Sequence, residues 1–177
     1  MGETVLIVGG ARSGKTRLAE RLAGEAVPVT YVATATYDAS DGEMADRIGR
    51  HRADRPPGWS TREVPRDLEA NLVELAGGGG SVVIDCLTLW LTNLMLGLGD
   101  GPELDDEAIL TALGRAVGGS RGGARMIWVS NEVGMGVVPD NPLARRFVDL
   151  QGRANQAVAA GADAVHFCVS GLPIRLK

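Results

Sequence analysis

The residue types in the first sixteen positions predict a binding site for a polyphosphate. Lys15 is one of two lysines in the sequence, against sixteen arginines, and it follows a run of glycine and small residues. Such a run lets successive backbone N–H groups point at an anion, and a compact ammonium can lie along the outer phosphates of a nucleotide. The hydroxyl of Thr16 is the kind of ligand that Mg²⁺ prefers. The P-loop pattern G-x-x-x-x-G-K-[ST] is met by Gly9, Gly10, Ala11, Arg12, Ser13, Gly14, Lys15 and Thr16.

The segments on either side of this loop are predicted to be a strand and a helix, which is the setting that a P-loop requires. Residues 4–8 form a short run rich in β-branched side chains, which is typical of a buried strand. Residues 16–23 place Leu18 and Leu22 on one face of a helix, whose positive dipole end would point at the anion. The alternative, a glycine-rich turn with an incidental Lys-Thr pair, does not account for this order of strand, loop and helix. We therefore predict that the chain binds a nucleotide.

A carboxylate that can organise a metal ion follows a second apolar run. Asp85 comes directly after Val-Val-Ile at positions 82–84, where P-loop proteins commonly carry an aspartate that holds Mg²⁺. A regulatory GTPase would have a glycine three residues later and an Asn-Lys-x-Asp sequence that reads guanine. This chain has Thr88 in place of that glycine. The segment most similar to the guanine-reading sequence is Ser-Asn-Glu-Val-Gly at positions 130–134. We predict Thr16 and Asp85 as metal ligands and disfavour a GTPase switch.

The two histidines differ in their surroundings. His166 lies within an apolar, strand-like run, which is typical of a core side chain. His51 shares a helix face with Arg47, and three further arginines lie at positions 50, 52 and 55. Neighbouring positive charge disfavours the imidazolium form, so we expect His51 to be neutral and nucleophilic. From the residues alone, contact with a phosphate and a merely solvated basic helix face remain equally open.

Apolar runs alternate with helical patterns along the rest of the chain, which predicts an α/β fold with a mostly parallel sheet and flanking helices. No linker is long enough to separate domains, so we expect residues 1–177 to form a single nucleotide-binding domain. An antiparallel strand is expected at the carboxyl end, at residues 172–176. A helix capped by Asn141 is expected to turn one apolar stripe toward the core, beginning at Leu143. The glycine-rich segment at residues 118–123 is expected to form a flexible turn.

The composition restricts the class of protein. A formal net charge of −4 and the lack of a basic patch with interleaved aromatic residues argue against a dedicated nucleic-acid binder. No apolar run reaches eighteen residues, so no membrane span is expected, and no signal peptide is visible. Cys86 and Cys168 both lie in apolar runs, where a buried, reduced thiol is typical. We expect a cytoplasmic protein.

Several segments, in the same order along the chain, resemble the bifunctional adenosylcobinamide kinase / adenosylcobinamide-phosphate guanylyltransferase family of cobalamin biosynthesis. The most specific is Asn131-Glu132-Val133-Gly134-Met135-Gly136-Val137-Val138-Pro139. The other matching segments are the P-loop, residues 43–48, His51-Arg52, residues 58–63, residues 83–94 and Val169-Ser170-Gly171.

The resemblance implies two reactions. ATP or GTP, with Mg²⁺, phosphorylates the aminopropanol hydroxyl of adenosylcobinamide. GTP then transfers GMP to adenosylcobinamide phosphate through a guanylylated histidine, and only His51 lies in the matching segment. The resemblance also implies a RecA-like fold and a homotrimer. It gives nucleotide contacts, beyond the P-loop and its catalytic Lys15, at Thr34, Ala35, Thr36, Arg52, Ala53, Asp54, Arg55, Glu63 and Asp85.

Two other functions compete with this one. A P-loop kinase for another small alcohol would transfer the γ-phosphate without forming a covalent nucleotide, and His51 would then be structural. A RecA-type module that binds nucleic acid would show ATPase activity stimulated by single strands and binding that weakens steeply with salt. The acidic composition disfavours this second alternative.

Overall fold

The computed structural model describes residues 2–24, 28–36, 49 and 56–177. A seven-stranded sheet with strand order β3-β2-β4-β5-β1-β6-β7 forms its centre. All neighbouring pairs in this sheet are parallel except β6 and β7. The strands are β1 Thr4–Gly9, β2 Val29–Ala33, β3 Ser60–Glu63, β4 Ser81–Asp85, β5 Arg125–Asn131, β6 Ala164–Val169 and β7 Leu172–Arg175.

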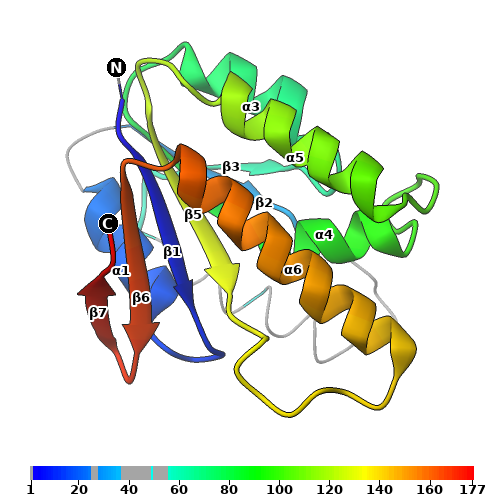
Figure 1. Ribbon diagram of the computed structural model, residues 1–177. Helices are drawn as coiled ribbons and strands as arrows, with labels where there is room; N and C mark the ends of the chain where they lie inside the picture. The colour runs from blue at the N-terminus through cyan, green and yellow to red at the C-terminus, as the bar shows by residue number, and fades with distance from the viewer. Residues whose placement is uncertain (1, 25–27, 37–48, 50–55) are drawn as a thin grey trace.

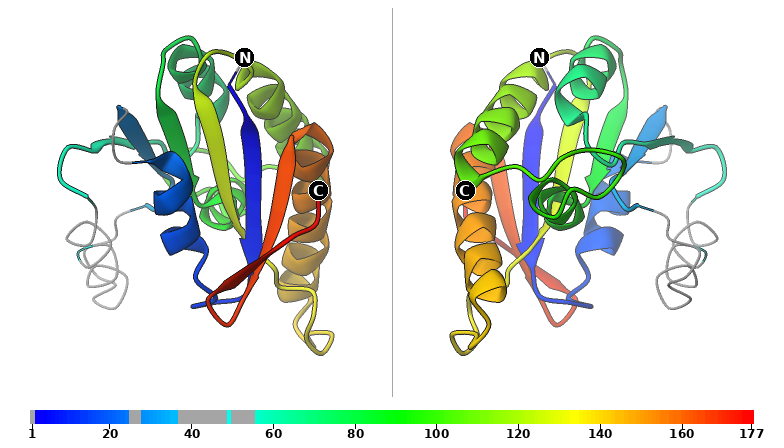
Figure 2. Two further views of the ribbon diagram at one scale, coloured as in Figure 1. Left: turned by 90° about the vertical axis from the view of Figure 1, so that its left-hand side faces the viewer. Right: turned by 90° about the vertical axis from the view of Figure 1, so that its right-hand side faces the viewer.

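Helices cover both faces of the sheet (Figure 1, Figure 2). Among the described elements, α1 packs on one face, and the other four helices pack on the opposite face. Side chains of β1 alternate accordingly, because successive residues of a strand point to opposite faces: Leu6 and Val8 join one core cluster, and Val5 and Ile7 join the other. The helices are α1 Lys15–Ala23, α3 Leu68–Ala76, α4 Leu87–Met95, α5 Asp106–Gly119 and α6 Pro142–Gly161.

The predicted fold is confirmed, including the antiparallel strand at the carboxyl end. Strands β6 and β7 pair from Val169 with Leu172 back to His166 with Arg175. The connecting residues, Ser170 and Gly171, both have positive φ angles (50° and 82°). Two such residues make the tight turn whose twist matches that of the flanking strands. Among the described helices, none is both long enough and apolar enough to cross a bilayer.

The prediction of a turn at residues 118–123 was partly wrong, because Gly118 and Gly119 are the last residues of α5. A Cβ atom at position 119 would lie 2.6 Å from Cγ2 of Val73 in α3. The missing side chain thus lets these two helices pack closely. Close helix packing, rather than a turn, accounts for this glycine.

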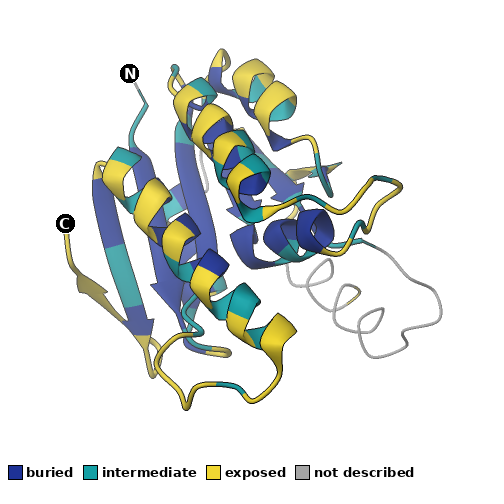
Figure 3. Cartoon of the chain, turned by 45° about the vertical axis from the view of Figure 1, so that its right-hand side comes forward, coloured by how far each residue is buried: buried dark blue, intermediate teal, exposed yellow. Residues whose placement is uncertain are grey.

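The apolar stripe of α6 is buried only in part. Asn141 caps the helix as predicted, and its side chain accepts hydrogen bonds from the N–H groups of Leu143 (2.8 Å) and Ala144 (3.2 Å). Leu150 is fully buried, but Leu143 is 47% exposed, contrary to the prediction. The helix has 20 residues and so spans about 30 Å, whereas a six-residue strand spans only about 20 Å. The first turn of α6 therefore extends beyond the sheet (Figure 3).

Matched substitutions on α6 test this packing. We expect Leu150→Ala to lower the free energy of unfolding by about 2–5 kcal/mol, because it leaves a cavity in the core. Leu143→Ala removes the same atoms from an exposed site and should cost less than about 1 kcal/mol. Urea denaturation of both variants measures the difference. Equal losses would show that Leu143 is also part of the core.

Candidate active site

The candidate site lies at the carboxyl edge of the sheet. Strands β1 to β6 run parallel, so their carboxyl ends meet at this edge, as the arrowheads of β1, β5 and β6 show (Figure 1). The P-loop leaves β1 at Gly9, Asp85 ends β4 and Glu63 ends β3. Residues 34–36 follow β2 directly. The topology thus gathers segments that are far apart in the sequence.

The P-loop ends in a sharp change of backbone direction. Gly14 is the N-cap of α1 and has a φ angle of 98°, a left-handed conformation that favours glycine. Lys15 is the first residue of the helix and is only 8% exposed. Its Nζ atom donates hydrogen bonds to the carbonyl oxygens of Gly9 (2.8 Å) and Gly10 (2.6 Å). The loop therefore holds its ammonium group inside its own turn.

Two segments from elsewhere in the chain hold the P-loop in place. The N–H of Glu132, directly after β5, donates to the carbonyl of Gly9 (3.1 Å), and the N–H of Gly171 donates to the carbonyl of Ser13 (3.0 Å). A Cβ atom on Gly14 would lie 3.1 Å from the Cα of Gly171. The Oγ of Ser13 is buried and has no hydrogen-bond partner among the described residues. An unpartnered hydroxyl within a glycine turn suits a loop that encloses an anion.

A hydrogen-bond network fixes the ends of β2 and β4. The hydroxyl of Tyr31 donates to Oδ2 of Asp85 (2.7 Å) and so orients this carboxylate. Thr34 is fully buried; its hydroxyl donates to the carbonyl of Cys86 (2.7 Å) and accepts from the N–H of Cys86 (2.8 Å). Asn93 of α4 donates to the carbonyl of Thr34 (2.7 Å). The structure thus gives Thr34 a positioning role, and its contact with a nucleotide stays a prediction.

Both thiols near this edge are buried and have raised pKa values. Burial, and secondly the charge of Asp85, raise the pKa of Cys86 to about 12. Burial also raises the pKa of Cys168 in β6. Because the thiolate is the nucleophilic form, neither side chain suits covalent catalysis near neutral pH. Both cysteines are free and buried, as the sequence predicted.

Not all the predicted site residues fall within the described parts of the chain. Gly9 to Thr16, Thr34 to Thr36 and Asp85 lie along the carboxyl edge, with Glu63 at its far end on β3. His51, Arg52, Ala53, Asp54 and Arg55 lie outside the described residues. His166 is half-buried in β6, and burial and the neighbouring Arg175 lower its pKa.

Sequence reasoning missed the contacts that Glu132 and Gly171 make with the P-loop. Both residues lie in segments that carry the family resemblance. Glu132 also comes soon after the apolar run at residues 126–129, which is the signal that could have revealed it. A buried cluster under this strand end also went unnoticed. Ser130 donates to Oδ1 of Asn155 (2.6 Å), and Gln151 donates to both Ser130 (3.0 Å) and Asn155 (3.1 Å). These polar side chains tie α6 to the end of β5.

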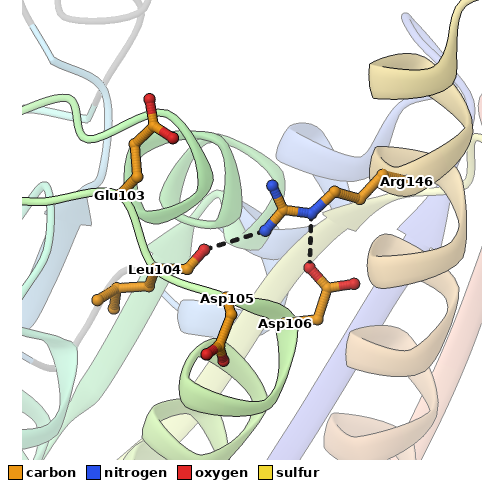
Figure 4. Close-up of a pocket in the computed structure, with 5 residues that line it drawn as sticks. All are labelled: Glu103, Leu104, Asp105, Asp106 and Arg146. Carbon is orange, nitrogen blue, oxygen red and sulfur yellow. Dashed lines mark hydrogen bonds and ion pairs between the residues drawn. The ribbon is translucent and has the colours of Figure 1, made fainter.

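A shallow depression of about 480 Å³ lies between the start of α5 and α6 (Figure 4). Arg146 spans it and donates to Oδ1 of Asp106 (2.8 Å) and to the carbonyl of Leu104 (3.0 Å). These bonds join the two helices. Among the predicted site residues that the structure describes, none lines this depression.

The glycine positions of the P-loop can be tested by stability alone. We expect Gly14→Ala to lower the free energy of unfolding by about 1–2 kcal/mol, because a side chain is strained at positive φ. Gly10→Ala should change it by less than about 1 kcal/mol, since a Cβ there would meet nothing within 4 Å. Urea denaturation without nucleotide separates packing from ligand binding. A Gly10 variant as unstable as the Gly14 variant would contradict this geometry.

Solved structures resemble this fold. A type III secretion system ATPase from pathogenic bacteria superposes with a TM-score of 0.58 at 13% identity, over 94% of this chain and 51% of the other. The P4 protein of bacteriophage phi6, solved in complex with ADP, has a TM-score of 0.50 at 15% identity, over 97% and 54% of the two chains. At these identities the likeness shows the fold alone.

Comparison of sequences identifies the family. The family model described as cobinamide kinase / cobinamide phosphate guanyltransferase matches residues 5–176. The bifunctional adenosylcobalamin biosynthesis protein CobP of Pseudomonas aeruginosa is 52% identical, over 97% of this chain and 96% of that protein. Its counterpart CobU of Salmonella typhimurium is 41% identical, over 98% and 99% of the two chains. The chain belongs to the cobinamide kinase / cobinamide phosphate guanyltransferase family.

Proposed function

We propose that this chain catalyses two successive reactions of cobalamin biosynthesis on one corrinoid substrate. It first phosphorylates the aminopropanol hydroxyl of adenosylcobinamide, and it then transfers GMP from GTP to the new phosphate. The products are adenosylcobinamide-GDP and pyrophosphate. The observation that carries this proposal is the match to the family model and to bifunctional relatives over nearly the whole chain.

The P-loop suits the phosphates of GTP or ATP in the first reaction. Lys15 already lies inside the loop, where its ammonium can follow the charge of the β- and γ-phosphates. The N-terminal end of α1 faces the same place and favours an anion. Catalysis of phosphoryl transfer depends mainly on positioning and charge stabilisation, which this rigid loop supplies.

Thr16 and Asp85 would hold Mg²⁺ with the nucleotide. The donor set fits, because a hydroxyl and a carboxylate are hard oxygen ligands. Neighbouring strands lie about 5 Å apart, so the ends of β1 and β4, with β5 between them, are about 10 Å apart. A span of this size suits an ion that keeps several of its waters, with Asp85 oriented by Tyr31. The bound ion would neutralise charge on the phosphates.

The second reaction requires a nucleophile that accepts GMP, and we assign this role to His51. A neutral imidazole attacks the α-phosphorus of GTP and releases pyrophosphate, and the phosphate of the corrinoid then displaces the histidine. The arginines at positions 47, 50, 52 and 55 in the sequence would stabilise the developing negative charge. Separate displacements let one nucleotide site serve two acceptors in turn.

The remaining partners follow from the same assignment. The substrates are adenosylcobinamide and its phosphate, with no nucleic acid, and the protein would work in the cytoplasm as a homotrimer. Met135 and Trp90 are candidate corrinoid contacts, and Met135 is 79% exposed and lies three residues after Glu132. Trp90, by contrast, is buried, and its Nε1 donates to the carbonyl of Arg66 (2.6 Å), so it belongs to the core.

Labelled GTP tests the covalent step. We expect the protein, incubated with Mg²⁺ and GTP labelled at the α-phosphate, to retain label that survives alkali but not acid, as a phosphoramidate does. His51→Ala should abolish this label, because it removes the nucleophile. His166→Gln is the matched control and should label as the wild type does.

Each other outcome has a distinct meaning. Absence of protein-bound label in the wild type, together with transfer of γ-label to adenosylcobinamide, would leave a kinase without guanylyltransferase activity. Label that persists in the His51 variant would move the nucleophile to another residue.

A further inference from the structure

Glu132 occupies a position between the P-loop and Asp85. It directly follows β5, the strand that separates β1 from β4 in the sheet. Asn131 is in register with Gly9 of β1, and Val129 is in register with Asp85 of β4. With neighbouring strands about 5 Å apart and a rise of about 3.3 Å per residue, the Glu132 backbone lies beside the start of the P-loop and about 10 Å beyond the level of Asp85 along the strands.

The backbone at Glu132 is rigidly held. Its N–H donates to the carbonyl of Gly9 (3.1 Å), and the preceding residue, Asn131, is hydrogen-bonded through both its N–H and its carbonyl. The N–H of Asn131 donates to Oγ1 of Thr88 (3.0 Å), and its carbonyl accepts from Nδ2 of Asn155 (3.1 Å). Thr88 and Asn155 are both buried. A side chain at this position is thus fixed relative to the P-loop, as catalytic groups must be.

The carboxylate of Glu132 can accept more hydrogen bonds than the one that the structure shows. Its Oε1 accepts a hydrogen bond from the N–H of Gly134 (2.7 Å), and it takes part in no ion pair with any residue that the structure describes. The side chain is half-buried. A carboxylate has two oxygens, and one bond from a backbone amide leaves it able to accept a proton.

Apolar surface follows Glu132 directly along the chain. Met135, Val137 and Val138 are 79%, 96% and 73% exposed, respectively. The loop that bears them joins the end of β5 to α6 and projects from the carboxyl edge (Figure 1). Three exposed apolar side chains in four residues suit contact with a large organic substrate rather than with water. Such a substrate would bring its hydroxyl to the same strand end.

We propose that Glu132 is the proton acceptor for the alcohol in the kinase reaction, an assignment that rests on the proposed function. The hydroxyl oxygen of the substrate attacks the γ-phosphorus of the nucleotide, and a new O–P bond forms. The bond between the γ-phosphorus and the β–γ bridging oxygen breaks, and the nucleoside diphosphate leaves. The proton of the hydroxyl passes to the Glu132 carboxylate and from there to water.

The guanylyl transfer supplies an internal control. Its acceptor is a phosphate, which is already ionised near neutral pH, so no alcohol has to be deprotonated. Loss of a general base for the kinase reaction should therefore slow the phosphorylation of adenosylcobinamide but not the transfer of GMP. A residue that merely shapes the shared nucleotide site would affect both.

Glu132→Gln tests the assignment in the full-length protein. The glutamine keeps an oxygen for the N–H of Gly134 but cannot take up the proton. We expect kcat for phosphorylation of adenosylcobinamide to fall by at least about 100-fold. Formation of adenosylcobinamide-GDP from adenosylcobinamide phosphate and GTP should stay within about threefold of the wild type. Asp140→Asn, which changes an exposed carboxylate farther along the same loop, should leave both rates unchanged.

Four results would overturn the assignment. Equal loss of both reactions would give Glu132 a structural role, and no loss in either would exclude it from catalysis. A large increase in the Mg²⁺ concentration needed for half-maximal residual kinase activity would make it a metal ligand instead. Failure of the wild type itself in both reactions would contradict the proposed function, and with it this assignment.

Discussion

The parallel arrangement of six strands is the constraint on which the site depends. Parallel strands end at a common edge, so residues that end β1, β3, β4 and β5 meet there although the sequence separates them widely. The order of the strands then sets the distances. Because β5 lies between β1 and β4, the P-loop and Asp85 are about two strand spacings apart, and the end of β5 lies between them. The buried cluster of Ser130, Gln151 and Asn155 fixes that strand end against α6.

The P-loop and the order of strands and helices could be predicted because their signals are local. The glycines, Lys15 and Thr16 of the loop are consecutive, and the strand before them and the helix after them are legible from apolar periodicity. The cap at Asn141 was predicted for the same reason, since a cap depends only on its own next few residues. The family resemblance depended on several such segments in order along the chain.

Contacts between distant segments could not be predicted, because no short pattern specifies strand order. The bonds from Glu132 and Gly171 to the P-loop exist only because β5 and β6 flank β1. The burial of Thr34 likewise depends on the end of β4 and on Asn93 of α4. At Leu143, by contrast, the sequence predicted burial that the structure does not show. The apolar periodicity of α6 continues past the edge of the sheet, so periodicity alone does not show where the core ends.

One chain adds both phosphates of adenosylcobinamide-GDP, the first by phosphorylation and the second by transfer of GMP. The most direct measurement supplies adenosylcobinamide, Mg²⁺ and GTP that carries different labels at its α- and γ-phosphates, and then isolates the corrinoid product. We expect equal amounts of the two labels, with the γ-phosphate from the kinase reaction and the α-phosphate from the transfer of GMP. A product that carries only the γ-label would show that the protein is a kinase without guanylyltransferase activity.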